Sequence, residues 1–366
     1  MKRIILSGGG TGGHIYPAVA VAEALKRRFG DEVELLFVGA EGKMEMEKVP
    51  ALGYNIVGLP TAGLQRRLTL SNLLLPFKVA KSISKAKRVI REFKADVVVG
   101  FGGYASAPVL WAAQRMGVPT VIQEQNSYAG VTNKILSRRA RKICVAYGGM
   151  ERFFPAERIL LTGNPVRQNL SNPSLSKDTA TAEFGFRTDK PTILLIGGSL
   201  GARTLNESML ASLKQIKNSN IQFIWQTGSY YKEHIAEELK KHGKLENLHV
   251  TDFIRSMDMA YMAADLVISR AGASSISELC LLGKPSILVP SPNVSEDHQT
   301  HNAMALVNTN AALIVKDAEA EEKLIPMAIN TVKDMNLLRT LGKNAHDMAF
   351  RDSDIKIAEE ILQLIK

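Results

Sequence analysis

IILSGGGTGGH, residues 4–14, is the stretch of sequence that decides the fold. Its aliphatic start predicts a short buried strand, and its glycines let the backbone turn tightly from that strand into a helix. Small and aliphatic residues then recur at helical spacing between Val19 and Leu25, which predicts a helix with one apolar face. A strand, a glycine loop and a helix in this order are typical of the start of a Rossmann-like domain.

The second half of the chain repeats this arrangement. Residues 192–202 read TILLIGGSLGA and precede a predicted helix at about 203–213. Deeper in each half, DVVVGFGGY at 96–104 corresponds to DLVISRAGA at 265–273. Fully apolar strands that alternate with helices form parallel sheets covered on both faces. We therefore expect an α/β protein with two Rossmann-like domains, whose parallel sheets face a central cleft.

The expected domains are residues 1–163 and 164–345, followed by a C-terminal segment, 346–366. That segment carries a predicted helix at about 355–364, which we expect to pack back on the first domain. The Ser, Asn and Pro residues of 169–181 predict an irregular loop after the join between the two domains.

The composition is that of a globular protein. Of the 366 residues, 45% are hydrophobic and 22% are charged, and no apolar run reaches the roughly 18 residues that a membrane span requires. The start of the chain is too short in its apolar part for a signal peptide. Cys144 and Cys280 lie in apolar surroundings, so we expect two buried thiols in a reducing cytosol rather than a disulfide.

The positive charge lies in the first half of the chain. Residues 1–163 hold 24 Lys and Arg against 12 Asp and Glu, whereas residues 164–366 hold 22 against 24. This asymmetry predicts that the first half meets an anionic partner: nucleic acid, phospholipid or a diphosphate.

The first glycine loop formally matches a dinucleotide-binding motif. Gly8, Gly10 and Gly13 satisfy the fingerprint that follows a strand. The acidic partner of a nicotinamide site is poor, however, because the next strand ends in Gly39 and Glu41 comes two residues later. The loop can still bring backbone N–H groups close to an anion or a sugar at a helix N-terminus.

Two other patterns carry weaker alternatives. Ser199 between Gly197 and Gly201 matches the nucleophile elbow of α/β-hydrolases, which also needs Asp and His partners. A phosphate cradle at the same place needs only the serine hydroxyl and N–H. His298 and His301 have the spacing of a metal site, but no further ligand cluster is evident, so we expect a solvated loop and helix start with no metal.

Short motifs spread over nearly the whole chain carry a family resemblance. They are GGTGGH at 9–14, GFGGY at 100–104, EQN at 124–126, AGVTNK at 129–134, GNPVR at 163–167, GGSLGA at 197–202, RAGA at 270–273 with Glu278, and His298-Gln299 with Asn302. In order and spacing they resemble the MurG-type transferases of peptidoglycan synthesis, which have the two-domain GT-B fold. Many relatives have His before Glu-Gln-Asn where this chain has Gln123, so a proton-transfer role at that position is doubtful.

The resemblance implies an inverting glycosyltransferase. The donor would be UDP-N-acetylglucosamine, and the acceptor the C4 hydroxyl of undecaprenyl-diphospho-N-acetylmuramoyl-pentapeptide (lipid I), which would become lipid II through a β-1,4 bond. Because the donor sugar is α-linked to UDP, inversion calls for one in-line displacement, a base for the hydroxyl and stabilisation of the departing diphosphate. No cofactor would be required, and the sequence leaves assistance by magnesium open.

The resemblance also implies where the substrates bind. The diphosphate or adjacent uridine would meet the Ser199 loop and Arg167, and the ribose hydroxyls would meet Glu278. Backbone groups of Ile254 would meet the uracil. The implied donor contacts are Thr11, Gly12, Gly13, Asn126, Arg167, Ser199, Ile254, Gly272, Ala273, Ser274, Glu278 and Gln299. Acceptor or sugar contacts are implied for Tyr104, Glu124, Asn133 and His298. Plainer interpretations stay open for Glu278, as a solvated charge, and for Asn126, as a turn former.

His14 is the candidate general base. The ordinary histidine pKa near 6.5 lets the ring accept a proton at neutral pH, and His14 ends the first glycine loop. The alternative is that His14 caps or orients the loop. Glu124 is a second candidate for the base.

Residues 64–94 read as a membrane-facing region, because hydrophobic and basic residues alternate there. The expected membrane contacts are Leu74, Leu75, Phe77, Lys78, Lys81 and Lys85. Each basic residue near an anionic lipid surface contributes roughly 1 kcal/mol. The alternative is a solvated helix whose apolar side lies in the core. We expect a peripheral protein at the cytoplasmic membrane face, with an anionic membrane surface and other cell-wall synthesis proteins as candidate partners.

Three competing functions stay open at this point. A UDP-sugar epimerase or another glycolipid transferase would share the uridine site and differ in the first half. A nucleic-acid-binding protein would use the basic first half, but the chain lacks a recognisable binding module and interleaved aromatics, so no nucleic acid partner is expected. A serine hydrolase would use Ser199.

Overall fold

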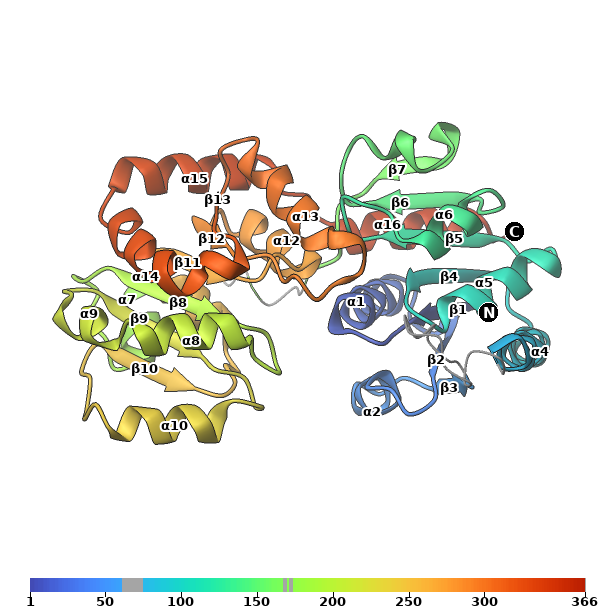
Figure 1. The fold of residues 1–366 in the computed structure, drawn as a ribbon. Helices are drawn as coiled ribbons and strands as arrows, with labels where there is room; N and C mark the ends of the chain where they lie inside the picture. Colours follow the sequence, from blue (N-terminus) through green and yellow to red (C-terminus); the bar gives the residue numbers. More distant parts are fainter. Residues whose placement is uncertain (61–74, 167–169, 171–173, 366) are drawn as a thin grey trace. The chain divides into compact units, whose positions relative to one another are not determined.

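The computed structural model describes residues 1–60, 75–166, 170 and 174–365, and it divides into two compact units (Figure 1). Unit 1 comprises Met1–Val166 together with Phe350–Lys366, and unit 2 comprises Arg167–Ala349. Each unit is built on its own parallel sheet, so the two-domain α/β organisation expected from the repeated strand–loop–helix pattern is confirmed.

Unit 1 contains, among its described residues, a seven-stranded sheet with the strand order β3-β2-β1-β4-β5-β6-β7. Its strands are β1 (Lys2–Gly8), β2 (Val33–Ala40), β3 (Ile56–Leu59), β4 (Val97–Gly102), β5 (Thr120–Glu124), β6 (Lys142–Val145) and β7 (Ile159–Leu161). The pairings are parallel throughout, for example between Ile4 and Val97. The first six strands follow the 3-2-1-4-5-6 order of a Rossmann fold.

Helices cover both faces of this sheet. They are α1 (Gly12–Phe29), α2 (Glu45–Ala51), α4 (Leu75–Phe93), α5 (Ser106–Arg115), α6 (Val131–Ser137) and α16 (Ser353–Leu362). Ile4 and Leu6 pack with α1 and α16 in one apolar cluster, whereas Ile5 packs with α4 and α5 in another. Neighbouring residues of a strand point to opposite faces, which is why a sheet buried on both faces needs a continuous apolar run.

Unit 2 repeats the same strand order. Its described sheet has six strands in the order β10-β9-β8-β11-β12-β13. They are β8 (Thr192–Ile196), β9 (Gln222–Gln226), β10 (Leu248–Thr251), β11 (Leu266–Ser269), β12 (Ser286–Leu288) and β13 (Leu313–Ile314). Counted from the first strand of the unit, this is again 3-2-1-4-5-6, so β8 and β11 correspond to β1 and β4.

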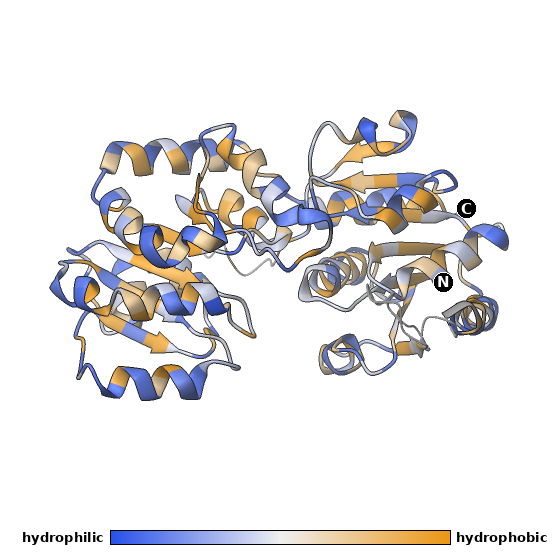
Figure 2. Cartoon of the chain, in the orientation of Figure 1, coloured by the Kyte–Doolittle hydropathy of each residue, from blue (hydrophilic) through white to orange (hydrophobic). Residues whose placement is uncertain are grey.

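The helices of unit 2 also lie on both faces of their sheet. They are α7 (Lys177–Glu183), α8 (Arg203–Ala211), α9 (Leu213–Asn218), α10 (Lys232–Lys240), α11 (Met257–Ala263), α12 (Ala273–Leu281), α13 (His298–Val307), α14 (Ala320–Thr331) and α15 (Met335–Asp347). Ile193 and Leu195 pack with α8 and α14, and Leu194 packs with α11 and α12. Figure 2 shows hydrophobic residues along the strands and polar residues on the outer helix faces.

One local expectation was wrong. The stretch predicted as an irregular loop after the join includes the start of α7, because Ser176 Oγ accepts the Thr179 N–H (3.1 Å) and caps this helix. The helix predicted at about 203–213 is confirmed as α8, which ends at Ala211, and α9 follows after Ser212.

The C-terminal helix α16 packs against α1 within unit 1. Its apolar side contributes Ile357 and Ile361 to the core around α1. Salt bridges join Arg27 to Asp354 (3.2 Å) and Arg28 to Glu359 (2.5 Å) at the same interface. The last segment of the chain is therefore part of the first unit, although the whole of unit 2 intervenes in the sequence.

Candidate active site

The candidate residues gather at the carboxyl ends of the strands. In open parallel sheets, ligands bind where the strand order reverses, outside the carboxyl ends of the two central strands. In unit 1 this point lies beyond β1 and β4, where Gly8 pairs with Gly102. In unit 2 it lies beyond β8 and β11, where Ile196 pairs with Ser269. Each unit thus has one expected ligand position.

His14 lies at the start of α1, half-buried beside its own loop. Its Nδ1 lies 3.0 Å from the Gly9 carbonyl oxygen and 3.3 Å from Thr11 Oγ1. Because a carbonyl oxygen can only accept, the contact with Gly9 requires a proton on Nδ1, and in the neutral ring Nε2 is then the basic nitrogen. The ring needs Gly102, since a Cβ there would lie 3.0 Å from His14 Nε2. Both sequence-based roles fit this geometry, because the ring contacts the loop and keeps one basic nitrogen.

Glu45, which the sequence motifs did not single out, lies under the same loop. It is the first residue of α2 and is fully buried. Its Oε2 accepts the Gly10 N–H (2.9 Å), and its Oε1 accepts the Ala40 N–H (2.9 Å). The sequence could have pointed to Glu45 as a glutamate that follows soon after the strand ending in Gly39. Glu41 was considered as the acidic partner instead, and Glu41 forms a salt bridge with Lys85.

Glu124 shapes a loop. This carboxylate is buried, and both of its oxygens accept hydrogen bonds. Oε1 accepts the backbone N–H and the side-chain amide of Asn126 (3.1 and 3.3 Å), and Oε2 accepts from Gly130 N (3.2 Å) and Asn133 Nδ2 (2.8 Å). These contacts favour the turn-forming interpretation of Asn126. They also show that Asn133 helps to hold the loop through Glu124.

Gln123 is fully buried. Its Nε2 donates to Asn164 Oδ1 (2.9 Å), and Asn164 Nδ2 donates to the Gln125 carbonyl oxygen (3.0 Å). Gln125 Nε2 in turn donates to the Phe101 carbonyl oxygen (2.8 Å). Position 123 therefore serves an internal amide network, which also explains why Asn164 belongs to unit 1 rather than to the second domain. Tyr104, beyond β4, is 54% exposed.

Ser199 lies in the glycine loop between β8 and α8, and its side chain is exposed. The Ser199 carbonyl oxygen accepts the Ser229 N–H (3.2 Å). The loop packs so closely on its neighbour that a Cβ at Gly201 would lie 2.1 Å from the Thr227 carbonyl oxygen. Gly201 also has φ of +88°, a conformation that L side chains rarely adopt. This packing fixes the loop in front of the α8 N-terminus.

The loop beyond β11 leads into α12, which Gly272 caps and Ala273 begins. Ser274 Oγ, in the first turn, is buried without a hydrogen-bond partner among the described residues. Glu278 is buried rather than solvated, and its Oε2 accepts from the Tyr261 hydroxyl (3.0 Å). Ile254 is also buried, in the core cluster beside α11. The solvated-charge interpretation of Glu278 is therefore wrong, and Tyr261 is a neighbour that sequence reasoning missed.

A buried ion pair joins several loops of unit 2. Arg270 and Asp317 form a salt bridge, and both side chains are mostly buried. Arg270 Nη1 also donates to the Val289 carbonyl oxygen (3.1 Å), at the end of β12. Asp317 Oδ2 accepts from Thr204 Oγ1 (2.9 Å), on α8. The pair thus connects the segments that follow β8, β11 and β12, which carry most of the expected donor contacts.

His298 and Gln299 begin α13 and are half-buried. Gln299 Oε1 accepts the Ser291 N–H (2.9 Å), so this side chain holds the loop that precedes the helix. Glu296 and Asp297 have φ of 54° and 50°, a strained conformation of the kind that often occurs at functional sites. Among the described residues, no group of three or more His, Cys, Asp or Glu side chains could hold a metal ion.

Several predicted residues fall elsewhere. Arg167 and Leu74 lie outside the described residues, as does the side chain of Leu75. Thr11 is exposed at the end of the first loop, and the half-buried Gly12 and Gly13 begin α1. No helix in the described part of the chain is long and apolar enough to span a bilayer.

The expected membrane-facing helix, α4, is exposed at its start and partly buried toward its end. Phe77 is 75% exposed, and Lys78 and Lys81 beside it are also exposed. Toward the other end, Val89 and Ile90 are buried in the core. Lys85 pairs with Glu41 and so offers no uncompensated charge. The first turns fit the membrane-facing expectation, and the last turns fit the alternative of an apolar side in the core.

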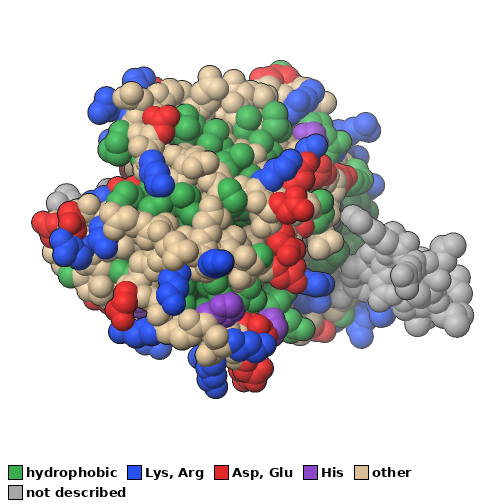
Figure 3. All heavy atoms as spheres, turned by 60° about the vertical axis from the view of Figure 1, so that its left-hand side comes forward, with side chains coloured by type: hydrophobic (Ala, Val, Ile, Leu, Met, Phe, Trp, Pro, Cys, Tyr) green, Lys and Arg blue, Asp and Glu red, His purple; other side chains and the backbone are tan. Residues whose placement is uncertain are grey.

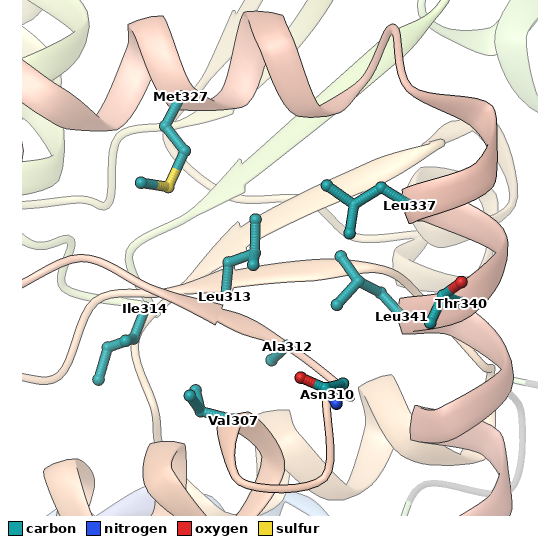
Figure 4. Close-up of a pocket in the computed structure, with 9 residues that line it drawn as sticks. All are labelled: Val307, Asn310, Ala312, Leu313, Ile314, Met327, Leu337, Thr340 and Leu341. Carbon is teal, nitrogen blue, oxygen red and sulfur yellow. The ribbon is translucent and has the colours of Figure 1, made fainter.

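A pocket of about 490 Å³ lies on unit 2 between α13, β13, α14 and α15 (Figure 4). Aliphatic side chains such as Leu313, Met327 and Leu341 point toward one another there, and the polar members are Asn310 and Thr340. It contains none of the candidate residues and no titratable side chain. On the face shown in Figure 3, basic and acidic side chains are interspersed.

Two family models match the chain, one for each half. The glycosyltransferase family 28 N-terminal domain matches residues 4–145, and the glycosyltransferase family 28 C-terminal domain matches residues 192–358. Together the two matches include the glycine loops of both units.

Curated relatives match over nearly full length. A protein of Phocaeicola vulgatus is 58% identical over 362 residues, with 99% of this chain and 96% of the relative covered. One of Bacteroides fragilis (strain YCH46) is 56% identical over 363 residues, covering 99% and 95%. Both are named UDP-N-acetylglucosamine–N-acetylmuramyl-(pentapeptide) pyrophosphoryl-undecaprenol N-acetylglucosamine transferase.

Solved structures agree with these matches. The crystal structure of Acinetobacter baumannii MurG aligns with a TM-score of 0.80 at 31% identity, covering 99% of this chain and all of that one. A UDP-GlcNAc 2-epimerase from Neisseria meningitidis bound to UDP-GlcNAc aligns with a TM-score of 0.68 at 13% identity, covering 99% and 100%. At that identity the second likeness shows the fold alone.

Proposed function

Starting from the fact that the chain belongs to glycosyltransferase family 28 and to its MurG-type members, we propose that it converts lipid I to lipid II. It transfers N-acetylglucosamine from UDP-N-acetylglucosamine to the C4 hydroxyl of undecaprenyl-diphospho-N-acetylmuramoyl-pentapeptide. The identities above 50% over almost the whole chain carry this substrate assignment, and they favour the transferase over the epimerase.

The assignment of tasks within the chain rests on the two glycine loops. Unit 2 takes the donor, because the N-termini of α8 and α12 favour the negative diphosphate and Glu278 offers acceptor oxygens to the ribose. Unit 1 takes the acceptor and supplies the base, because His14 carries its proton on Nδ1 toward Gly9. The contact between His14 Nδ1 and the Gly9 carbonyl oxygen, at 3.0 Å, is the observation that best supports the mechanism.

The reaction proceeds by one displacement. The acceptor C4 oxygen forms a bond to the sugar C1 as the bond between C1 and the diphosphate oxygen breaks, so the α-linked donor gives a β-linked product. The hydroxyl proton passes to His14 Nε2, and the electron pair leaves with UDP. General-base assistance of this kind contributes about 100- to 10,000-fold.

The leaving group requires stabilisation of negative charge, which we assign to the protein rather than to a metal ion. Backbone N–H groups at the starts of α8 and α12 supply a positive potential. Transfer that persists in excess EDTA supports this assignment. Transfer that stops in EDTA and returns on addition of magnesium contradicts it.

The direct test uses purified protein, UDP-[14C]N-acetylglucosamine and a short-chain lipid I analogue. We expect radiolabel in the lipid product and release of one UDP for each sugar transferred. Formation of UDP-N-acetylmannosamine without labelled lipid would instead identify an epimerase. No product of either kind would contradict the proposed function.

The proposed location is the cytoplasmic face of the membrane, held peripherally by the start of α4. Phe77 and Val79 expose apolar surface next to the exposed Lys78 and Lys81. Exposed apolar side chains beside basic ones suit a surface of anionic lipid.

Vesicle sedimentation tests this contact. The double variant Lys78→Glu and Lys81→Glu should bind phosphatidylglycerol vesicles less than wild type and bind UDP equally well, and high salt should mimic the loss. The matched control is Lys214→Glu with Lys217→Glu, which changes two exposed lysines of α9 in unit 2. Equal loss in both variants would show a general charge effect and remove the α4 assignment.

A further inference from the structure

We propose that Glu45 is a positioning residue for the general base, acting through the peptide group between Gly9 and Gly10. The proposal rests on the proposed function, because it assigns the base role to His14. It adds a buried carboxylate that the substrates do not touch, and it assigns that carboxylate an effect on turnover rather than on donor binding.

Glu45 is built into the site. The carboxylate is fully buried, and each oxygen accepts one backbone N–H at 2.9 Å, from Gly10 and from Ala40. A Cβ at Gly9 would lie 2.1 Å from Glu45 Oε1, and a Cβ at Gly39 would lie 2.5 Å from Glu45 Cγ. Two glycines therefore leave the space that this side chain occupies, which argues against an incidental contact.

The link to His14 runs through one peptide group. The Gly9 carbonyl and the Gly10 N–H belong to the same planar unit and point in opposite directions. Glu45 binds the N–H on one side, and His14 Nδ1 lies 3.0 Å from the carbonyl oxygen on the other. The orientation of this peptide thus decides whether a carbonyl oxygen faces the imidazole ring.

The charge of Glu45 has a second effect on the same chain of hydrogen bonds. An anionic acceptor at the N–H polarises the peptide and makes its carbonyl oxygen a stronger acceptor, since hydrogen bonds in series reinforce one another. A stronger acceptor holds the proton on Nδ1 and leaves Nε2 as the base. Glu45, the peptide and His14 together resemble the carboxylate–histidine pair of hydrolytic triads, with a peptide group inserted between the two side chains.

The test compares Glu45→Gln with Glu47→Gln, the same change on the same helix at an exposed side chain. Glutamine keeps the shape but turns one acceptor into a donor that faces a backbone N–H. We expect Glu45→Gln to lower kcat by about 10- to 100-fold, the usual effect of losing a hydrogen bond to a charged group. The KM for UDP-N-acetylglucosamine and the Kd for UDP should stay within about twofold of wild type, and Glu47→Gln should match wild type in all three.

A spectroscopic measurement separates positioning from general damage. Ring 15N signals of His14, assigned by comparison with His14→Gln, should show a neutral ring protonated on Nδ1 in wild type and in Glu47→Gln. Glu45→Gln should shift them toward a mixture of the two tautomers. Wild-type kcat with an unchanged ring in Glu45→Gln would overturn the proposal. A raised donor KM with unchanged kcat would overturn it too.

The ring measurement also covers two other failures. If Glu45→Gln does not fold, a wild-type ring protonated on Nε2 overturns the proposal by itself, and one protonated on Nδ1 supports it. If wild type transfers no sugar, the proposed function fails, and the ring measurement still reports whether Glu45 sets the tautomer.

Discussion

The two glycine loops occupy the same position in the same strand order, yet they have different neighbours. In unit 1 the loop after β1 has a buried carboxylate, Glu45, on the Gly10 N–H and a histidine at its end. In unit 2 the loop after β8 packs on the backbone of Thr227–Ser229 and presents the exposed Ser199 before α8. Each loop precedes a helix N-terminus, but in the first loop a phosphate would also meet the negative charge of Glu45.

The difference shows how one architecture supports two tasks. A Rossmann loop offers backbone N–H groups, and what occupies them decides what the loop can bind. In unit 1 an internal carboxylate accepts the Gly10 N–H, so this N–H is not offered to a ligand. The loop of unit 2 has the geometry of a phosphate cradle, which agrees with a donor on that unit.

His14→Ala is expected to give the largest difference between an effect on turnover and an effect on UDP binding. Turnover should fall by about 100- to 10,000-fold, because general-base assistance is lost. Affinity for UDP, measured by calorimetry, should stay at the wild-type value, since we propose that the nucleotide binds to unit 2. The pH profile of turnover should lose the limb that histidine ionisation produces. Near-normal turnover with an unaltered profile would reject His14 as the base.

The donor side of the comparison is tested by Glu278→Ala. Loss of a charge-assisted hydrogen bond to the ribose should weaken UDP binding by about 1.5–3 kcal/mol. Because Glu278 also accepts from Tyr261, the variant Tyr261→Phe is the control for lost internal support. Equal weakening in both variants would mean that Glu278 acts through the fold rather than on the ligand. Unchanged UDP affinity in Glu278→Ala would remove this residue from the site.

Two matched glycine-to-alanine substitutions each introduce one methyl group that clashes at one of the two glycine loops. Gly201→Ala should weaken UDP binding by about 10-fold or more, because the Cβ would lie 2.1 Å from Thr227 O and the backbone has positive φ. Gly103→Ala, just after β4, creates an equivalent clash against the loop of unit 1, because its Cβ would lie 2.2 Å from Gly9 O. It should lower turnover and spare UDP binding. Loss of UDP binding in both variants would abolish the proposed division of tasks.

A smaller effect on donor binding is expected from the Arg270–Asp317 pair, which supports the loops of unit 2 indirectly. Asp317→Asn weakens the pair with Arg270 and should raise the KM for the donor by about 3- to 10-fold, with kcat little changed. Glu319→Gln, two residues away and paired with Lys323 at the surface, is the control. Surface pairs contribute little, so the control should match wild type. A lower kcat at unchanged KM would contradict the positioning of the donor loops.

The smallest effect on activity is expected from the two cysteines, one in each unit. Burial raises the pKa of both Cys144 and Cys280 to about 12, so their thiols stay protonated and inert at neutral pH. Since the unfolded chain loses these protons at a lower pH, the linked stability is full below about pH 9 and falls as pH rises toward 12. Iodoacetamide should label both thiols slowly in native protein and quickly in urea, without loss of transfer before unfolding. Fast native labelling would contradict this burial.

Local patterns were sufficient for the architecture. The apolar strands, the glycine loops and their recurrence in the two halves predicted two Rossmann-like units, because strand periodicity and tight turns depend on neighbouring residues. The same motifs identified Glu278, Ser199 and His14 as residues of interest. The family resemblance added the substrates, which no spacing could have supplied.

Contacts between distant segments were beyond the reach of the sequence. Glu45 is an ordinary surface residue by its helix pattern, and only the folding of α2 beneath the first loop buries it against Gly9 and Gly39. Likewise, the pairing of Lys85 with Glu41 depends on how α4 lies along the sheet. Glu124 was expected to contact substrate, but its hydrogen bonds go to the loop that follows it.

The sequence by itself determined the two parallel sheets, the positions of the glycine loops and the family. Only the tertiary structure decided that α16 completes unit 1, that Glu278 is buried beside Tyr261, and that a carboxylate occupies the first loop. The physical reason is range: backbone propensity acts over a few residues, whereas burial and hydrogen-bond partners depend on which distant segments the packed core brings together.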